Sequence, residues 1–241
     1  MAGITEDSPG DILILGMGTG TFAKYCSEYF PDCSIEGVEI DQKIAALARE
    51  YFELPDSVQV TVGDGRSFLA ASDKKYNVIM VDAYQDITIP FQMSSVEFFT
   101  LVKEHLNENG VMVVNMNMHS DAEGNINDYL SDTIAEVFDY VYTVEVRGST
   151  NRELFATQNP DVLSDFEAVR ETIEDTELQM MLTRVSDGIT LYEKGEYLLT
   201  DDKAPVELLG MQVIDALIQE ELSYYKDLFK LKGIRGFLED I

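Results

Sequence analysis

The sequence has few of the residues that cross-link chains or bind metals: its 241 residues include two cysteines, two histidines and no tryptophan. Cys26 and Cys33 form neither a CxxC pair nor a disulfide framework, which is typical of a reducing compartment. No apolar run approaches the roughly 20 residues of a membrane-spanning helix, and the first residues lack the features of a signal peptide. We therefore expect a cytoplasmic protein with no metal site and no membrane association.

Basic residues are also scarce, because 17 Lys and Arg stand against 45 Asp and Glu and give a formal net charge of −28. This charge repels nucleic acids and anionic membranes, so we expect neither as a partner. It attracts small cationic molecules instead. A solvated surface adapted to salt explains the same charge, and that alternative stays open.

Three glycines at alternate positions, Gly16, Gly18 and Gly20, follow directly on an unbroken apolar run over residues 11–15. Such a run is typical of a strand buried on both faces. A helical pattern begins at Thr21, where the dinucleotide-binding fingerprint would require a further glycine. Glycines let backbone N–H groups approach a ligand closely, and the start of a helix offers more unpaired donors. The stretch therefore predicts the floor of a nucleotide-like pocket.

Strands and helices are predicted to alternate along most of the chain. Apolar or β-branched runs predict the strands, and apolar residues at helical spacing predict the helices between them. The expected strands cover residues 11–15, 34–38, 58–62, 76–81, 111–115, 141–146 and 153–157. Four successive strand–helix repeats predict an α/β fold with a doubly wound, mostly parallel, seven-stranded sheet, because right-handed crossovers allow little else. A short turn joins the last two strands, which predicts an antiparallel hairpin at the sheet edge.

Local signals place two of the boundaries and the C-terminal region. Ser94 and Ser95 are expected to cap a helix, with Glu97 as the capping-box partner of Ser94, and Asn109-Gly110 is expected to form the turn before the fifth strand. Beyond Pro160 the pattern is helical. We expect a nucleoside-binding catalytic α/β domain over residues 1–158 and C-terminal helices over residues 159–241 that pack on the same domain.

Acidic residues follow the second, third and fourth predicted strands. Glu39 ends the second strand, where a carboxylate accepts hydrogen bonds from both hydroxyls of a ribose. Asp64 lies between two glycines after the third strand and is suited to accept the exocyclic amine of an adenine. Asp82 follows the fourth strand, opposite the glycine turn. Because ligands of open α/β sheets bind at the carboxyl ends of the strands, we expect these carboxylates to converge on one crevice.

With these residues the sequence resembles class I S-adenosylmethionine-dependent methyltransferases, and among them the spermidine synthase group of polyamine aminopropyltransferases. The matching segments are Ile14-Leu15-Gly16-Met17-Gly18-Thr19-Gly20, Val38-Glu39-Ile40-Asp41, Gly63-Asp64-Gly65-Arg66-Ser67-Phe68-Leu69 and Tyr76-Asn77-Val78-Ile79-Met80-Val81-Asp82-Ala83. The late segment Leu199-Thr200-Asp201-Asp202-Lys203-Ala204-Pro205-Val206-Glu207 is similar to one in bacterial spermidine synthase-like proteins. The resemblance implies a Rossmann-like sheet of the class I methyltransferase type.

The resemblance also implies roles for the site residues. S-adenosylmethionine or its decarboxylated form would be held by Gly16, Gly18, Gly20, Glu39, Asp64, Gly65 and Asp82. Asp82 and Asp86 would be catalytic by taking the proton of the attacking amine, and Tyr84 and Gln85 would contact the substrate. The family pattern D-S-[ST]-D-P differs here, because Gln85 stands where the second acid is expected and Asp86 follows one position later. Asn115, Asn117 and His119 are further candidates on the loop after the fifth strand.

Three functions are compatible with these residues. The first is a spermidine synthase-like transferase of polyamine biosynthesis that moves an aminopropyl group to a small cationic amine and leaves methylthioadenosine. The second is a small-molecule methyltransferase that leaves S-adenosylhomocysteine. The third is a non-catalytic polyamine- or nucleoside-binding relative. Two features favour it: Gln85 replaces an acid, and the first core strand begins after ten residues, where the family has a small β-domain. A homodimer is compatible with all three.

Overall fold

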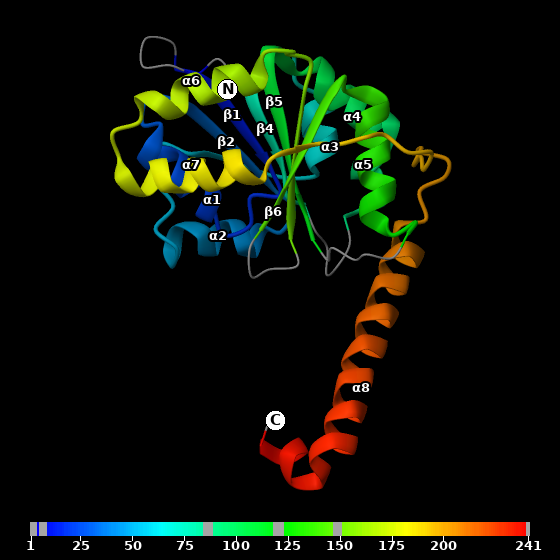
Figure 1. Ribbon diagram of the computed structural model, residues 1–241. Coiled ribbons are helices and arrows are strands. Elements are labelled where there is room, and N and C mark those ends of the chain that lie inside the picture. The colour runs from blue at the N-terminus through cyan, green and yellow to red at the C-terminus, as the bar shows by residue number, and fades with distance from the viewer. Residues whose placement is uncertain (1–3, 5–8, 84–88, 118–122, 147–150, 240–241) are drawn as a thin grey trace.

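The computed structural model describes residues 4, 9–83, 89–117, 123–146 and 151–239. Within these residues the chain forms one sheet flanked by helices on both faces (Figure 1). The strands are β1 (Asp11–Leu15), β2 (Ser34–Glu39), β3 (Gln59–Val62), β4 (Tyr76–Val81), β5 (Leu106–Met116), β6 (Tyr140–Glu145), β7 (Arg152–Thr157) and β8 (Thr190–Leu191). Their order across the sheet is β3-β2-β1-β4-β5-β7-β6-β8, and the first five are parallel.

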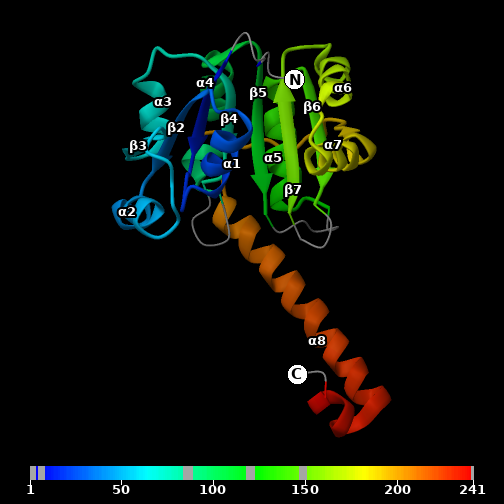
Figure 2. The ribbon, with the colours of Figure 1, turned by 90° about the vertical axis from the view of Figure 1, so that its left-hand side faces the viewer.

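The helices form the outer layers of the domain. They are α1 (Thr21–Tyr29), α2 (Gln42–Glu50), α3 (Gly65–Ala70), α4 (Val96–Glu104), α5 (Ile126–Val137), α6 (Val162–Thr172), α7 (Thr176–Gly188), α8 (Val206–Glu239) and the 3-10 turn η1 (Phe91–Met93). Figures 1 and 2 show α3, α4 and α5 on one face of the sheet and α1, α2, α6 and α7 on the other. The predicted Rossmann-like α/β architecture is thus confirmed.

Strand β1 lies at the centre of the sheet and explains its unbroken apolar sequence. Leu13 and Leu15 pack in the core under α3, α4 and α5, whereas Ile12 and Ile14 pack on the side of α1. All four are at most 2% exposed. A strand covered on both faces has no solvent-facing position, so the alternation of apolar and polar residues disappears.

The sheet has one strand more than the sequence predicted. The hairpin of β6 and β7 is antiparallel as expected, but β7 lies between β5 and β6, and β8 pairs with β6 beyond it. Only two residues, Thr190 and Leu191, form β8, and both are exposed. So short a strand has no periodicity to detect. It exists because tertiary packing brings it to Tyr142 and Thr143 of β6.

Two local predictions near α4 and β5 are wrong in detail. Ser95 alone caps α4, by accepting a hydrogen bond from the Phe98 amide at 3.2 Å. Glu97 does not complete a capping box with Ser94, because its carboxylate accepts the amide of Asp201 at 3.0 Å. The predicted turn at 109–110 lies within β5, where the register with β4 shifts. A shift of this kind accommodates the two turn-forming residues inside a continuous strand.

The segment after β8 is fixed to the domain by an ion pair. Arg66 of α3 binds both carboxylate oxygens of Asp201 at 2.7 Å, and Ser95 donates to the same carboxylate at 2.5 Å. Val206 and Leu209 at the start of α8 are then buried in the main core. The rest of α8 extends away from the sheet (Figures 1 and 2) and carries exposed apolar side chains such as Leu222.

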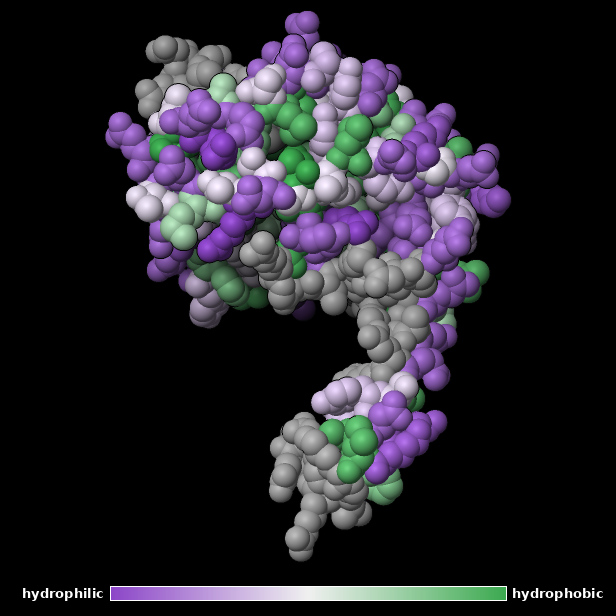
Figure 3. All heavy atoms as spheres, viewed as in Figure 1, coloured by the Kyte–Doolittle hydropathy of each residue, from purple (hydrophilic) through white to green (hydrophobic). Residues whose placement is uncertain are grey.

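The outer surface is dominated by hydrophilic side chains on the face that Figure 3 shows. This agrees with the excess of acidic residues in the sequence. In the described part of the chain, no helix has the length and apolar character required to cross a membrane.

Candidate functional site

A cavity of about 470 Å³ opens where the carboxyl ends of β1, β4 and β5 meet the first residues of β7. Its size lies within the range of small-molecule sites. Its position is the one expected for ligands of open α/β sheets. It is lined by Ile14, Gly16, Met17, Gly18, Thr19, Thr21, Phe22, Tyr25, Met80, Asp82, Asn115 and Glu153.

Gly16 and Gly18 of the glycine turn line this cavity, whereas Gly20 does not. Gly16 has φ +84°, and a Cβ built on it would lie 2.5 Å from the carbonyl oxygen of Asp82. The turn therefore lies directly against the end of β4, at a distance that no side chain allows. Gly18 has φ +57°, and a Cβ built on it would meet nothing within 4 Å. Its backbone thus borders open space in which a ligand can approach.

Glu39 lies at the end of β2 and holds the glycine turn. Its carboxylate is buried and accepts hydrogen bonds from the amides of Gly18 at 2.7 Å and Asp41 at 2.9 Å. Each carboxylate oxygen accepts more than one hydrogen bond, so these contacts leave capacity for ribose hydroxyls. Glu39 does not line the cavity itself. A contact between Glu39 and a ribose therefore stays a prediction, and the ribose would lie on the side of Gly18 that faces β2.

Asp64 and Gly65 follow β3 and also lie outside the cavity lining. Asp64 caps α3, because its Oδ1 accepts the amide of Ser67 at 2.7 Å. Gly65 is buried, and a Cβ there would touch Leu15 and Met93 at 3.4 Å. Both residues thus have structural roles in the fold. The adenine contact assigned to Asp64 stays a prediction.

Asp82 follows β4 and points into the cavity together with Asn115 of β5. Asn115 donates to Oδ1 of Asp82 at 3.1 Å and accepts from the amide nitrogen of Asn151 at 3.1 Å, which fixes its orientation. Burial raises the pKa of Asp82, and the hydrogen bond from Asn115 partly opposes that change. The structure thus brings Asp82 and Asn115 to the glycine turn. Of the three carboxylates expected to converge on one crevice, Asp82 lines this cavity, whereas Glu39 and Asp64 do not.

Glu153 is a cavity residue that the sequence reasoning missed. In β7 it pairs directly with Asn115, and the alternation of side chains leaves Leu154 in the core on the opposite face. Burial first, and the charge of Asp82 second, raise the pKa of Glu153 to about 7. A signal was present in the sequence. Glu153 begins the last predicted strand, directly after the short antiparallel turn, and such a residue lies beside the carboxyl end of the neighbouring strand.

Several predicted residues lie outside the part of the chain that the structure describes. These are the candidate catalytic residue Asp86, the candidate substrate residues Tyr84 and Gln85, and His119. Asn117 directly follows β5, and its backbone carbonyl accepts a hydrogen bond from the side-chain amide of Asn127 at 3.3 Å. The roles assigned to all of these residues stay predictions.

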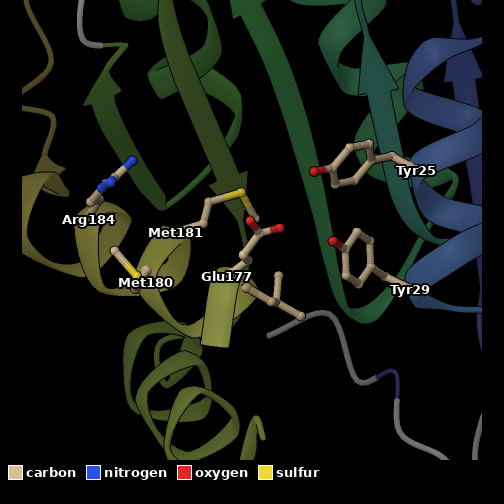
Figure 4. Close-up of a pocket in the computed structure, with 7 residues that line it drawn as sticks. Tyr25, Tyr29, Glu177, Met180, Met181 and Arg184 are labelled. Atoms are coloured by element: carbon tan, nitrogen blue, oxygen red, sulfur yellow. The ribbon is translucent and has the colours of Figure 1, made fainter. Parts of the chain in front are cut away.

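A second cavity of about 330 Å³ lies between α1 and α7. Figure 4 shows Tyr25 and Tyr29 of α1 opposite Glu177 and Met181 of α7. Of these, Tyr25 also lines the first cavity. The groove contains none of the glycines or strand-end carboxylates that the sequence singled out. The cavity at the carboxyl edge is therefore the better candidate for a catalytic site.

Comparisons with known proteins agree with this assignment. The spermine/spermidine synthase domain family matches residues 1–152. A protein of Bifidobacterium longum (strain NCC 2705) named probable polyamine aminopropyl transferase is 49% identical over 252 residues, which cover 98% of this chain and 56% of that protein. The chain thus spans little more than half the length of this relative.

Two solved structures share the fold. A probable spermidine synthase from Corynebacterium glutamicum ATCC 13032 superposes with a TM-score of 0.58 at 24% identity, over 77% of this chain and 72% of that one. Human methyltransferase-like protein 13, in complex with SAH, gives 0.59 at 23% identity, over 75% and 82%. At these identities the likeness establishes the class I methyltransferase fold. Because the family's domain matches well over half of the residues of this chain, the chain belongs to the spermine/spermidine synthase family.

Proposed function

We propose that this chain transfers an aminopropyl group from decarboxylated S-adenosylmethionine to a small amine. The observation that carries the proposal is the half-buried carboxylate of Asp82, held by Asn115 beside an open glycine turn. Family membership and the named Bifidobacterium longum relative support the choice of reaction. Because the chain spans little more than half of that relative, its activity and its substrate are proposals.

The residues around the glycine turn fit a nucleoside cosubstrate. The space above Gly18 would be filled by any Cβ, and Glu39 lies next to it with acceptor capacity for a ribose. Asp64 lies further along the same edge of the sheet for an adenine amine, with one oxygen on the Ser67 amide. Thr19 and Phe22 border the adjoining cavity, where the aminopropyl portion would extend.

The cosubstrate supplies a carbon activated by a positively charged sulfur, so the chain's own residues have to bind, orient and deprotonate the acceptor. Asp82 accepts a hydrogen bond from the acceptor nitrogen and takes its proton. Asn115 keeps Asp82 in place through the bond to Oδ1. The apolar parts of Ile14, Met80 and Phe22 exclude water around the reacting atoms. Most of the rate enhancement then comes from alignment of the two reactants.

A turnover assay tests this function. The protein is incubated with putrescine and decarboxylated S-adenosylmethionine, and methylthioadenosine is measured by chromatography. We expect methylthioadenosine to form in proportion to enzyme, and Asp82→Asn to reduce the rate by about 100-fold or more, as for the loss of a general base. No product with either cosubstrate form, despite nucleoside binding, would favour the non-catalytic alternative.

The methyltransferase alternative differs in the cosubstrate. Calorimetric titration with decarboxylated and with intact S-adenosylmethionine separates the two functions. Tighter binding of the decarboxylated form is expected for aminopropyl transfer. Tighter binding of the intact form, together with S-adenosylhomocysteine as product, would support the alternative.

Location and assembly complete the proposal. A cytoplasmic location fits the free thiols of Cys26 and Cys33. Binding of nucleic acid does not fit the net charge of −28. A homodimer is proposed on the basis of the exposed apolar side chains of α8, and sedimentation velocity measures it.

A further inference from the structure

Two carboxylates from different strands face the same cavity. Asp82 follows β4 and Glu153 begins the cavity side of β7, and the register places Asn115 of β5 between the two strands. All three side chains lie on the face of the sheet that α1 covers, where Phe22 and Tyr25 form the opposite wall. The arrangement brings together two residues that lie 71 positions apart in the sequence.

The Glu153 carboxylate has no hydrogen-bond donor among the residues that the structure describes. In the described part of the chain, the Asp82 carboxylate accepts one hydrogen bond, from Asn115 to Oδ1. Among the described residues that line the cavity there is no lysine and no arginine. The two acids on this cavity repel each other, and this repulsion adds to burial in raising the pKa of Glu153.

A bound cation removes this imbalance. An ammonium group offers several N–H donors, which suits two carboxylates that have unused acceptor capacity. The rings of Phe22 and Tyr25 supply an apolar wall for the methylene chain of an alkylamine and a face for its charge. An anion or a neutral apolar ligand would leave both acids without a partner.

We propose that Glu153 is the second carboxylate of the amine subsite and binds the cationic acceptor together with Asp82. This inference rests on the proposed function in the choice of ligand class. In the sequence, Gln85 stands in the loop after Asp82 at the position where a second acid is expected. The inference assigns the role of that second acid to Glu153 of β7.

Proton release on binding is a specific consequence. Near pH 7 the empty pair holds part of a proton on Glu153, and a bound ammonium favours the fully ionised pair. The other titratable group on the cavity wall, within the described residues, is Tyr25. Arg152 lies on the opposite face of β7 and binds Glu145 of β6 at 2.7 Å. Amine binding should therefore expel a fraction of a proton that Glu153 carries.

Calorimetry on the full chain tests the proposal, with putrescine as the probe and methylthioadenosine present at saturation. Titrations at pH 6, 7 and 8, in buffers of different ionisation enthalpy, give both the affinity and the number of protons released. We expect Glu153→Gln to weaken putrescine binding by about tenfold or more and to abolish proton release near pH 7. Methylthioadenosine affinity should change less than twofold.

Glu108→Gln is the matched control, because Glu108 is an exposed glutamate near the start of β5, at the opposite edge of the sheet. It should bind putrescine and release protons as the wild type does. Circular dichroism checks that each variant is folded. If Glu153→Gln does not fold, Glu153→Asp replaces it: the charge is retained on a shorter side chain, and putrescine should bind more weakly than to wild type, whereas an equal affinity overturns the inference.

The outcomes separate this inference from the proposed function. Equal putrescine affinity for wild type and Glu153→Gln overturns the inference, even if methylthioadenosine is formed in the turnover assay. Failure of the wild type to bind putrescine overturns it as well. Glu153-dependent binding without any turnover supports the inference and counts against the proposed transfer.

Discussion

Replacing Gly16 by alanine should damage both the fold and the site, because this glycine is where the turn after β1 meets the end of β4. Its φ of +84° is one that L-residues rarely adopt. An added Cβ would lie 2.5 Å from the Asp82 carbonyl oxygen, 2.6 Å from the Ala83 Cα and 2.7 Å from the Asp82 carbonyl carbon. All three are backbone atoms, so no side-chain rotation relieves the contact.

Two terms set the size of the effect. The left-handed backbone costs an alanine about 1–2 kcal/mol. Moving two backbone segments apart to admit a methyl group costs roughly 1–3 kcal/mol more. The free energy of unfolding should therefore fall by about 2–5 kcal/mol. Since two of the three displaced atoms belong to Asp82, a shift of about 1 Å should also lower the transfer rate by about 100-fold.

Two other glycine variants isolate these terms. Gly18→Ala has the strained φ of +57° but no contact within 4 Å, so it should cost about 1–2 kcal/mol. Gly63→Ala has neither a positive φ nor a close contact and should change stability by less than about 1 kcal/mol. Urea denaturation followed by circular dichroism measures all three. If Gly16→Ala is as stable as Gly18→Ala, the close approach of the turn to Asp82 is refuted.

Two further predictions concern buried carboxylates. The carboxylate of Asp132 in α5 accepts hydrogen bonds from the backbone amides of Gly195 at 2.6 Å and Tyr197 at 2.9 Å. Asp132→Asn places an amide group against these donors and should lower the free energy of unfolding, measured by urea denaturation, by about 2–3 kcal/mol. A loss under about 0.5 kcal/mol would contradict this role. Glu153 has a folded-state pKa of about 7 against an ordinary 4.5, so the empty protein loses stability as pH rises between these values. Glu153→Gln should therefore match wild type in stability at pH 4 and exceed it by about 1–3 kcal/mol at pH 8, whereas a gain independent of pH would argue against a burial-raised pKa.

The central part of the fold could be predicted from the sequence because each signal there is local. The apolar run of β1, the glycines after it and the β-branched strands each report their own backbone conformation. Four strand–helix repeats then leave little choice of topology. Asp82 and Asn115 were predicted at the site for the same reason, since each one directly follows or ends a strand.

The rest depends on contacts between distant segments. The insertion of β7 between β5 and β6, and the pairing of β8 with β6, follow from packing that no short window of sequence contains. Glu97 binds the amide of Asp201, which lies 104 residues away, instead of capping its own helix. Glu153 was missed because a glutamate at the start of an expected edge strand is usually exposed. The structure places β7 inside the sheet, where its pairing with Asn115 brings Glu153 to the cavity.

A crystal structure with bound methylthioadenosine tests the central claim most directly, since the claim is that the turn after β1 holds a nucleoside with the acceptor acids beside it. We expect both ribose hydroxyls to donate to Glu39, and the methylthio group to lie in the cavity next to Asp82. A nucleoside bound instead between α1 and α7, or a Glu39 carboxylate that keeps only its backbone donors, would contradict the account.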